Sequence, residues 1–125
     1  MRLLLDTQLY LWFIVDSPKL SKRARDTIAR ANDVYVSATS IWEMSIKIAL
    51  GKLSADETDL VRAIDASGFV ELPILARHAA FVASLPPHHR DPFDRMLIAQ
   101  AIQEPLRLLT ADKTLKRYSD LVDVV

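Results

Sequence analysis

The sequence contains no cysteine and only two glycines among its 125 residues. The absence of cysteine excludes a disulfide framework, a thiolate zinc site and a cysteine nucleophile. Because glycine occurs only as Gly51 and Gly68, neither a Walker phosphate-binding loop nor a GxGxxG dinucleotide turn exists anywhere in the chain. Two large classes of nucleotide-binding site are therefore excluded.

Net charge and long hydrophobic runs are absent as well. Sixteen Lys and Arg balance sixteen Asp and Glu, so global charge gives no argument for nucleic-acid binding, although a local basic patch is compatible with it. No apolar segment approaches the roughly twenty residues that cross a bilayer. The apolar amino terminus is interrupted by Asp6 and lacks a signal-peptide cleavage site. We expect a cytoplasmic protein with no membrane partner.

Half of the residues are hydrophobic, which is enough for one domain with a core of its own. Five short apolar runs are typical of buried strands: Leu3–Leu5, Val34–Val36, Phe69–Leu72, Leu106–Leu109 and Val122–Val124. Longer amphipathic segments separate them. This alternation predicts an α/β sandwich in which helices cover a parallel sheet.

The expected helices are recognised by their caps and their periodicity. They cover residues 21–31 after a cap at Ser21, 38–50, 54–68 with a capping box from Ser54 to Glu57, 75–85, and 92–103. Two helices fit between the third and fourth strands, since Pro86-Pro87 divides that segment. Asp91 before Pro92 has the pattern of an N-cap followed by proline at the first helical position.

Four acidic residues are predicted to meet at one edge of this sheet. In a parallel sheet each crossover helix begins at the edge where the strands end. Asp6 follows the first strand, Glu43 lies near the start of the helix after the second, and Asp112 follows the fourth. Asp94 occupies the first turn of the helix that leads back to the fourth strand, and that helix begins at the same edge.

Each of these acids, taken singly, also fits a helix-capping role, and Ser40–Glu43 has the spacing of a capping box. Four carboxylates at one edge repel each other unless a cation is bound, whereas Ser, Thr or Asn would cap equally well. An all-oxygen site suits Mg²⁺ or Mn²⁺ and favours phosphodiester hydrolysis. Thr7 and Thr110 are candidates to orient a carboxylate or a water, or else simple junction residues.

Four stretches together resemble one known family. They are Leu3–Thr7, Ser40–Glu43 followed by Gly51–Leu53, His89–Ala101, and Leu108–Asp112. Their order is similar to that of PIN domains, and within that superfamily to the VapC-type toxins of bacterial toxin-antitoxin modules. The stretch DPFDRMLIAQA is the specific one, and the resemblance spans nearly the whole chain.

The resemblance implies a three-layer α/β/α sandwich with a mainly parallel central sheet, and a single nuclease domain over residues 1–125. It also implies a Mg²⁺- or Mn²⁺-dependent endoribonuclease that a cognate antitoxin holds inactive, commonly as a homodimer. By motif position the acidic centre falls on Asp6, Glu43, Asp94 and Asp112, with Thr110 as the accompanying hydroxyl. We predict Asp6, Asp94 and Asp112 as metal ligands, and Glu43 as the group that positions or deprotonates the attacking water.

RNA cleavage requires cations near the phosphates. The candidates beside the acids are Arg90, Arg95, Lys113, Lys116 and Arg117. The basic residues of 19–30 are interpreted as a solvated helix face. Trp12 and Trp42 are predicted to lie in the core, His88 and His89 in a loop, and His78 shows no partner in the sequence.

Two non-enzymatic alternatives stay open on the residues alone. A receiver-type signalling domain also gathers acids at a sheet edge, but it needs adjacent acids after the first strand, and Asp6 stands alone. It also needs an aspartate at the end of the third strand, where Glu71–Pro73 stands. The other alternative is a PIN-like partner-binding module without turnover, which only an assay separates from a nuclease.

Overall fold

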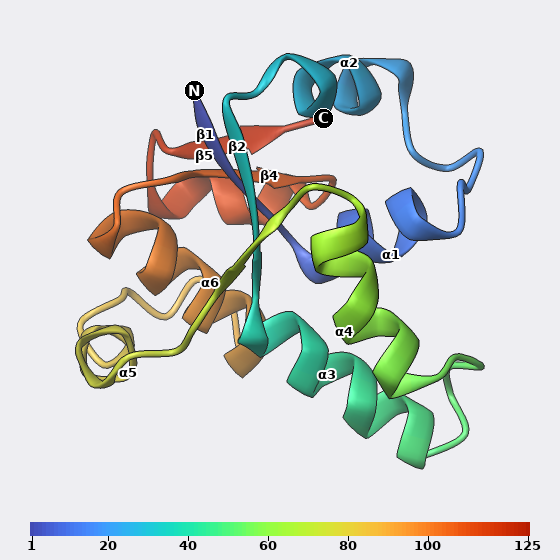
Figure 1. The fold of residues 1–125 in the computed structure, drawn as a ribbon. Helices are drawn as coiled ribbons and strands as arrows, with labels where there is room; N and C mark the ends of the chain where they lie inside the picture. Colours follow the sequence, from blue (N-terminus) through green and yellow to red (C-terminus); the bar gives the residue numbers. More distant parts are fainter.

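One five-stranded sheet organises the chain in the computed structural model, which describes residues 1–125. The strands are β1 (Arg2–Leu5), β2 (Asp33–Ser37), β3 (Val70–Leu72), β4 (Arg107–Thr110) and β5 (Val122–Val124). They run in the order β3-β2-β1-β4-β5, and every neighbouring pair is parallel (Figure 1). The predicted α/β fold with a mainly parallel central sheet is confirmed.

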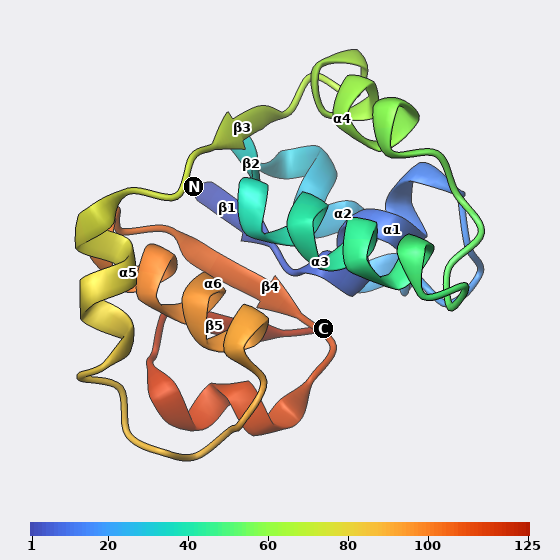
Figure 2. The same cartoon turned by 90° about the horizontal axis from the view of Figure 1, so that it is seen from below.

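Helices form the two outer layers. They are α1 (Thr7–Ile14), α2 (Lys22–Arg30), α3 (Ala38–Ala49), α4 (Glu57–Ala66), α5 (Ala76–Val82), α6 (Pro92–Gln103) and the 3₁₀-helix η1 (Lys113–Tyr118). The first four cover one face of the sheet, and α5, α6 and η1 cover the other (Figure 2). None of these helices has the length and apolar character that spanning a membrane requires.

The central strand β1 shows how the two layers are held. Its side chains alternate between the faces, so Leu3 and Leu5 join the hydrophobic cluster of α1 to α4, while Leu4 joins the cluster of α5 and α6. All three leucines are fully buried. The end of β1, where Asp6 follows, is therefore packed from both sides.

Side-chain caps explain where most helices begin. Ser21 accepts the N–H of Ala24, and Asp91 accepts the N–H groups of Phe93 and Asp94, as their sequence patterns predict. Pro92 then occupies the first turn of α6, where its missing N–H costs nothing.

Two predicted capping boxes are wrong. Helix α3 begins directly at the end of β2, where the Ser37 hydroxyl accepts the N–H of Thr39, so Ser40 and Glu43 lie inside the helix. Helix α4 begins after Asp56, whose carboxylate accepts the N–H of Asp59, and Ser54 stays outside it. In both cases another side chain with an acceptor oxygen lay within three residues of the predicted cap.

Buried side chains anchor α6 to the sheet, and a substitution of Leu97 tests this packing. This side chain is fully buried in the second cluster. We expect Leu97→Ala to lower the free energy of unfolding by roughly 2 to 5 kcal/mol in urea titrations, because it leaves a cavity. Val61→Ala, at an exposed position of α4, should change it by less than about 0.5 kcal/mol. Equal losses in the two variants would contradict this packing.

Candidate functional site

A cleft of about 300 Å³ lies at the carboxyl edge of the sheet. All four predicted acids line it: Asp6, Glu43, Asp94 and Asp112. A fifth acid, Asp91, lies beside them, and so do two lysines that the sequence analysis did not single out, Lys47 and Lys52. The acids come from four different elements of the chain and meet as the strand-end argument predicts.

Asp6 is held by hydrogen bonds at both carboxylate oxygens. Its Oδ1 accepts the N–H of Leu9 at 2.8 Å, which caps α1, and its Oδ2 accepts the hydroxyl of Thr110 from the neighbouring strand β4. The Thr110 oxygen also accepts the N–H of Asp112 at 3.0 Å. Thr110 thereby fixes the first and the last acid relative to each other.

Burial raises the pKa of Asp6 to about 6, although the Thr110 and Leu9 bonds oppose the rise. The charges of Glu43 and Asp112 raise the pKa further. Thr7 lines the same cleft. Its hydroxyl donates to the hydroxyl of Ser40 at 2.9 Å and so ties α1 to α3.

Glu43 is the acid with an unused oxygen. It lies in the second turn of α3 and is 8% exposed. One oxygen, Oε2, lies 3.2 Å from the Lys47 ammonium, whereas Oε1 is buried without any hydrogen-bond partner. A buried carboxylate oxygen without a partner is costly, so this position calls for a cation or a bound water.

Of the two acids with a raised pKa, Asp94 shows the larger rise. Burial raises its pKa to about 7, and the charges of Asp91, Asp6 and Glu43 add to the rise. Asp91 caps α6 as predicted, and its charge also acts on Asp94 one turn later. Asp91 therefore both caps α6 and contributes to the raised pKa of Asp94.

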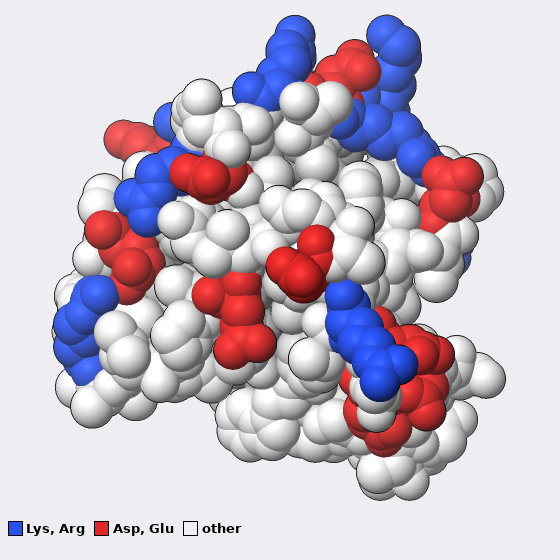
Figure 3. All heavy atoms as spheres, in the orientation of Figure 1, with Lys and Arg blue, Asp and Glu red and all other residues white.

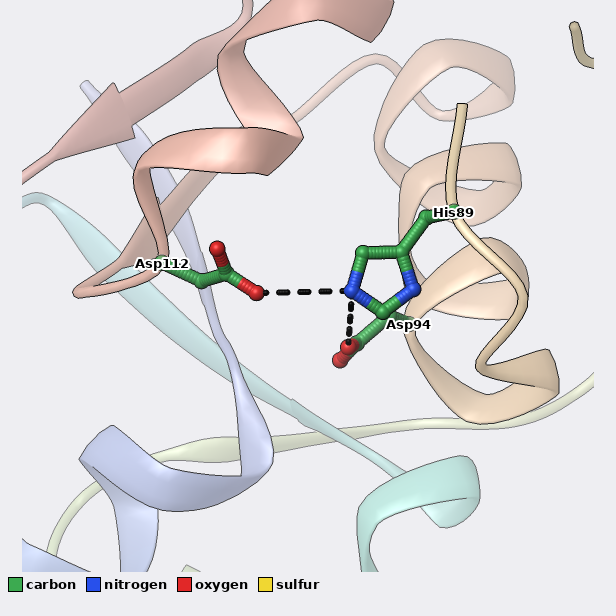
Figure 4. A group of neighbouring side chains, drawn as sticks. All are labelled: His89, Asp94 and Asp112. Atoms are coloured by element: carbon green, nitrogen blue, oxygen red, sulfur yellow. Dashed lines mark ion pairs between the residues drawn. The ribbon is translucent and has the colours of Figure 1, made fainter. Parts of the chain in front are cut away.

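His89 stands between two of the acids (Figure 4). Its Nε2 lies 3.6 Å from Oδ2 of Asp94 and 3.5 Å from Oδ2 of Asp112. Its Nδ1 accepts the N–H of Asp91 at 3.0 Å, which assigns the proton of the neutral ring to Nε2. The ring thus directs an N–H at the two carboxylates.

These three side chains are also close enough to share a metal ion, with donor atoms within 4.8 Å of one another. Coordination through Nε2 would move the ring proton to Nδ1 and break the bond from Asp91. The carboxylates need no such rearrangement. Oxygen donors are thus the ready ligands of this site, and they match Mg²⁺ or Mn²⁺.

Asp112 behaves differently from the other acids. Burial opposes its ionisation, but hydrogen bonds from the hydroxyl and N–H of Thr114 outweigh it and lower the pKa, and His89 lowers it further. Its Oδ1 caps η1, while Oδ2 is the oxygen that faces His89. Asp112 is therefore ionised under conditions in which Asp94 still binds a proton.

None of the five predicted substrate-binding cations lines the cleft: Arg90, Arg95, Lys113, Lys116 and Arg117. Arg95 donates to the carbonyl groups of Val82, Leu85 and Pro86, so it fastens the connection between α5 and α6. Lys116 donates to a backbone carbonyl of β5 at 2.8 Å. Figure 3 shows basic and acidic side chains intermingled on the face drawn, without a continuous basic surface.

The predicted core position is confirmed for one tryptophan and wrong for the other. Trp12 packs against the first core cluster, as predicted. Trp42 is 55% exposed, so its predicted core position is wrong, and its ring packs edge to face with Phe93 of α6. His78, without a partner in the sequence pattern, is fully buried with Nε2 2.6 Å from the Glu104 carboxylate. Tertiary contacts decide both positions.

Comparison with known proteins identifies the fold and the family. The family model described as PIN domain matches residues 3–121. The chain belongs to the PIN domain family. It is 27% identical over 124 residues to Ribonuclease VapC22 of Mycobacterium tuberculosis, covering 92% of this chain and 90% of that protein.

Two solved structures share this fold. One is VapBC2 from Rickettsia felis bound to a DNA fragment from their promoter, with a TM-score of 0.73, 17% identity and coverage of 100% of this chain and 98% of that chain. The other is FitAcB from Neisseria gonorrhoeae, with a TM-score of 0.63, 22% identity and coverage of 90% and 89%. At these identities the likeness establishes the fold.

The raised pKa of Asp94 predicts how the metal-free protein responds to pH. Its folded-state pKa of about 7 exceeds the ordinary 3.8, so the folded state holds a proton that the unfolded state releases, and stability falls as pH rises between these values. We expect Asp94→Asn to raise the melting temperature at about pH 8 in EDTA by roughly 3 to 6 °C. The gain should shrink towards about pH 5.

Calorimetric melts over this pH range provide the measurement. Asp65→Asn, an exposed position on α4, is the control and should leave the pH profile unchanged. A profile of the Asp94 variant that coincides with the wild type would show that Asp94 carries no such repulsion.

Proposed function

We propose that this PIN domain is a Mg²⁺- or Mn²⁺-dependent endoribonuclease and the toxin component of a toxin-antitoxin system. Membership of the family and the similarity to a VapC ribonuclease support the reaction class. The observation that carries the proposal is the cleft itself. Four carboxylates from four elements surround it, two with raised pKa values and one with a buried, unpartnered oxygen.

Asp6, Asp94 and Asp112 are the residues that would hold the ion, directly or through water. Burial and mutual repulsion disfavour their joint ionisation, which a divalent cation reverses. A bound Mg²⁺ or Mn²⁺ supplies positive charge to the phosphate oxygens and lowers the pKa of water. The donor set fits this ion because it consists of hard oxygen ligands.

The remaining catalytic roles are assigned to side chains that do not hold the ion. Glu43 is assigned to orient the attacking water and accept its proton, because Oε1 is free while Lys47 holds Oε2. Thr110 keeps the carboxylate of Asp6 in place through its hydroxyl. Since Glu43 projects from a helix packed on the core through Met44, its position is set before substrate arrives.

Replacement of single acids tests the reaction. We expect Asp6→Asn and Asp94→Asn each to reduce Mn²⁺-dependent RNA cleavage on the order of 100-fold or more, because each removes a charge that the transition state needs. The measurement maps new 5′ ends in total RNA after brief induction of the wild type and of each variant. Asp26→Asn, on the exposed side of α2, is the matched control.

Circular dichroism of the variants separates lost chemistry from lost fold. Cuts present in the wild type and the control but absent from both folded variants support the nuclease. Identical maps for all chains would favour the alternative of a non-catalytic, receiver-like or partner-binding domain.

A cognate antitoxin and a homodimer complete the proposal, and both follow from the VapC-type resemblance. The related structures support a protein partner, since VapBC2 and FitAcB are toxin-antitoxin complexes. We expect growth arrest on induction of this chain, relieved by co-expression of the protein encoded beside it. Growth arrest that persists with that protein present would contradict its role as the antitoxin. A monomer in analytical sedimentation would contradict the homodimer.

A further inference from the structure

Two lysines are the only cations that line the acidic cleft. Lys47 belongs to α3, and Lys52 follows that helix in the stretch Gly51-Lys52-Leu53. No role in holding a metal suits an ammonium group, which has three donors and no acceptor. Their place beside the carboxylates therefore requires a separate explanation.

The backbone after α3 places Lys52 next to Lys47. Gly51 has a φ of +72°, a conformation that glycine adopts without strain and that turns the chain back on the helix. The N–H groups of Lys52 and Leu53 then both donate to the carbonyl of Lys47, at 2.8 and 3.3 Å. Leu53 packs against the first core cluster, so this turn is anchored.

The charges of the cleft favour an anion at these lysines. Five carboxylates line the cleft and repel a phosphate, and a single divalent ion offsets only part of their charge. Lys47 uses one donor on Oε2 of Glu43 and keeps its side chain 49% exposed, so further donors remain available. Lys52 is exposed as well.

We propose that Lys47 and Lys52 bind phosphate groups of the RNA strand, so that the strand crosses the carboxyl-terminal turn of α3 on its way into the acid cluster. This inference rests on the proposed ribonuclease function and adds the path that the RNA strand takes to the acids. It replaces the path along η1, where Lys113 and Arg117 lie outside the cleft. Phosphate contacts position a strand without reading its bases.

Binding of RNA in the absence of catalysis tests the path. The probe is a fluorescein-labelled single-stranded RNA, titrated with the full chain in EDTA at several salt concentrations and followed by anisotropy. We expect Lys47→Met and Lys52→Met each to weaken binding by about 3- to 10-fold for every RNA sequence, and to reduce the slope of log K against log salt by roughly 0.7 per lost contact. Lys47→Arg and Lys52→Arg should retain binding.

Lys22→Met is the matched control, because Lys22 also forms an i,i+4 ion pair, with Asp26, but lies on α2. It should leave affinity and slope unchanged. The same chains assayed for Mn²⁺-dependent cleavage should show a raised KM for the two Met variants. Because Lys52 touches no carboxylate by an ion pair, its effect does not pass through Glu43.

Two failures are distinguishable. If the wild type cleaves RNA but both Met variants keep its KM, affinity and salt slope, the lysine path is overturned and the ribonuclease stands. Loss of affinity in Lys113→Met instead of the α3 variants would overturn it in the same way and assign the strand to η1. If the wild type neither binds nor cleaves RNA, the proposed function itself falls.

Discussion

Repulsion between carboxylates held at one edge of a parallel sheet is the constraint on which this structure depends. The register of β1 against β4 pairs Leu5 with Leu109, and the N–H of Asp6 donates to the Leu109 carbonyl. Asp6 therefore cannot move away from the acids that follow β4 without breaking the sheet. Three donors contact the carboxylates in the cleft: the Thr110 hydroxyl, the His89 ring and the Lys47 ammonium. None of them removes the charge, which only a proton on an acid such as Asp94 or a bound cation would neutralise.

Capping and metal binding are compatible roles for the acids in this geometry. Asp6 and Asp112 each use Oδ1 to cap a helix and keep Oδ2 for a second contact, with the Thr110 hydroxyl in Asp6 and with the His89 ring in Asp112. A carboxylate has two oxygens, whereas a serine or threonine cap has one. An aspartate at such a junction can therefore start a helix and still present a ligand atom. This explains why sequence arguments about a single acid remain ambiguous while arguments about the set succeed.

The sequence predicts what depends on periodicity and strand ends. The five strands, the limits of α6 and the meeting of Asp6, Glu43, Asp94 and Asp112 all follow from these two signals. It does not predict what depends on loop conformation. His89 reaches the acids because Arg95 holds the connection before α6, and Lys52 lines the cleft because Gly51 reverses the chain.

The exposure of Trp42 lies beyond sequence patterns for a different reason. An apolar residue on a helix packs inward only if its face meets the sheet, and residues 43 and 44 take that side of α3. The spacing of Glu43 and Lys47, by contrast, is a signal that was present. An acid followed by a lysine four residues later marks a helical ion pair, and here that pair faces the cleft.

The burial of Leu3, Leu4 and Leu5 in β1 has a consequence for the timescale on which the cleft can change. Amides of a central strand that is hydrogen-bonded on both sides exchange with solvent only when the whole protein opens. Asp6 directly follows such a strand, whereas His89 lies in a connection outside the sheet. The position of Asp6 in the cleft therefore persists as long as the sheet does, whereas the position of His89 depends on the hydrogen bonds that Arg95 donates to the connection before α6.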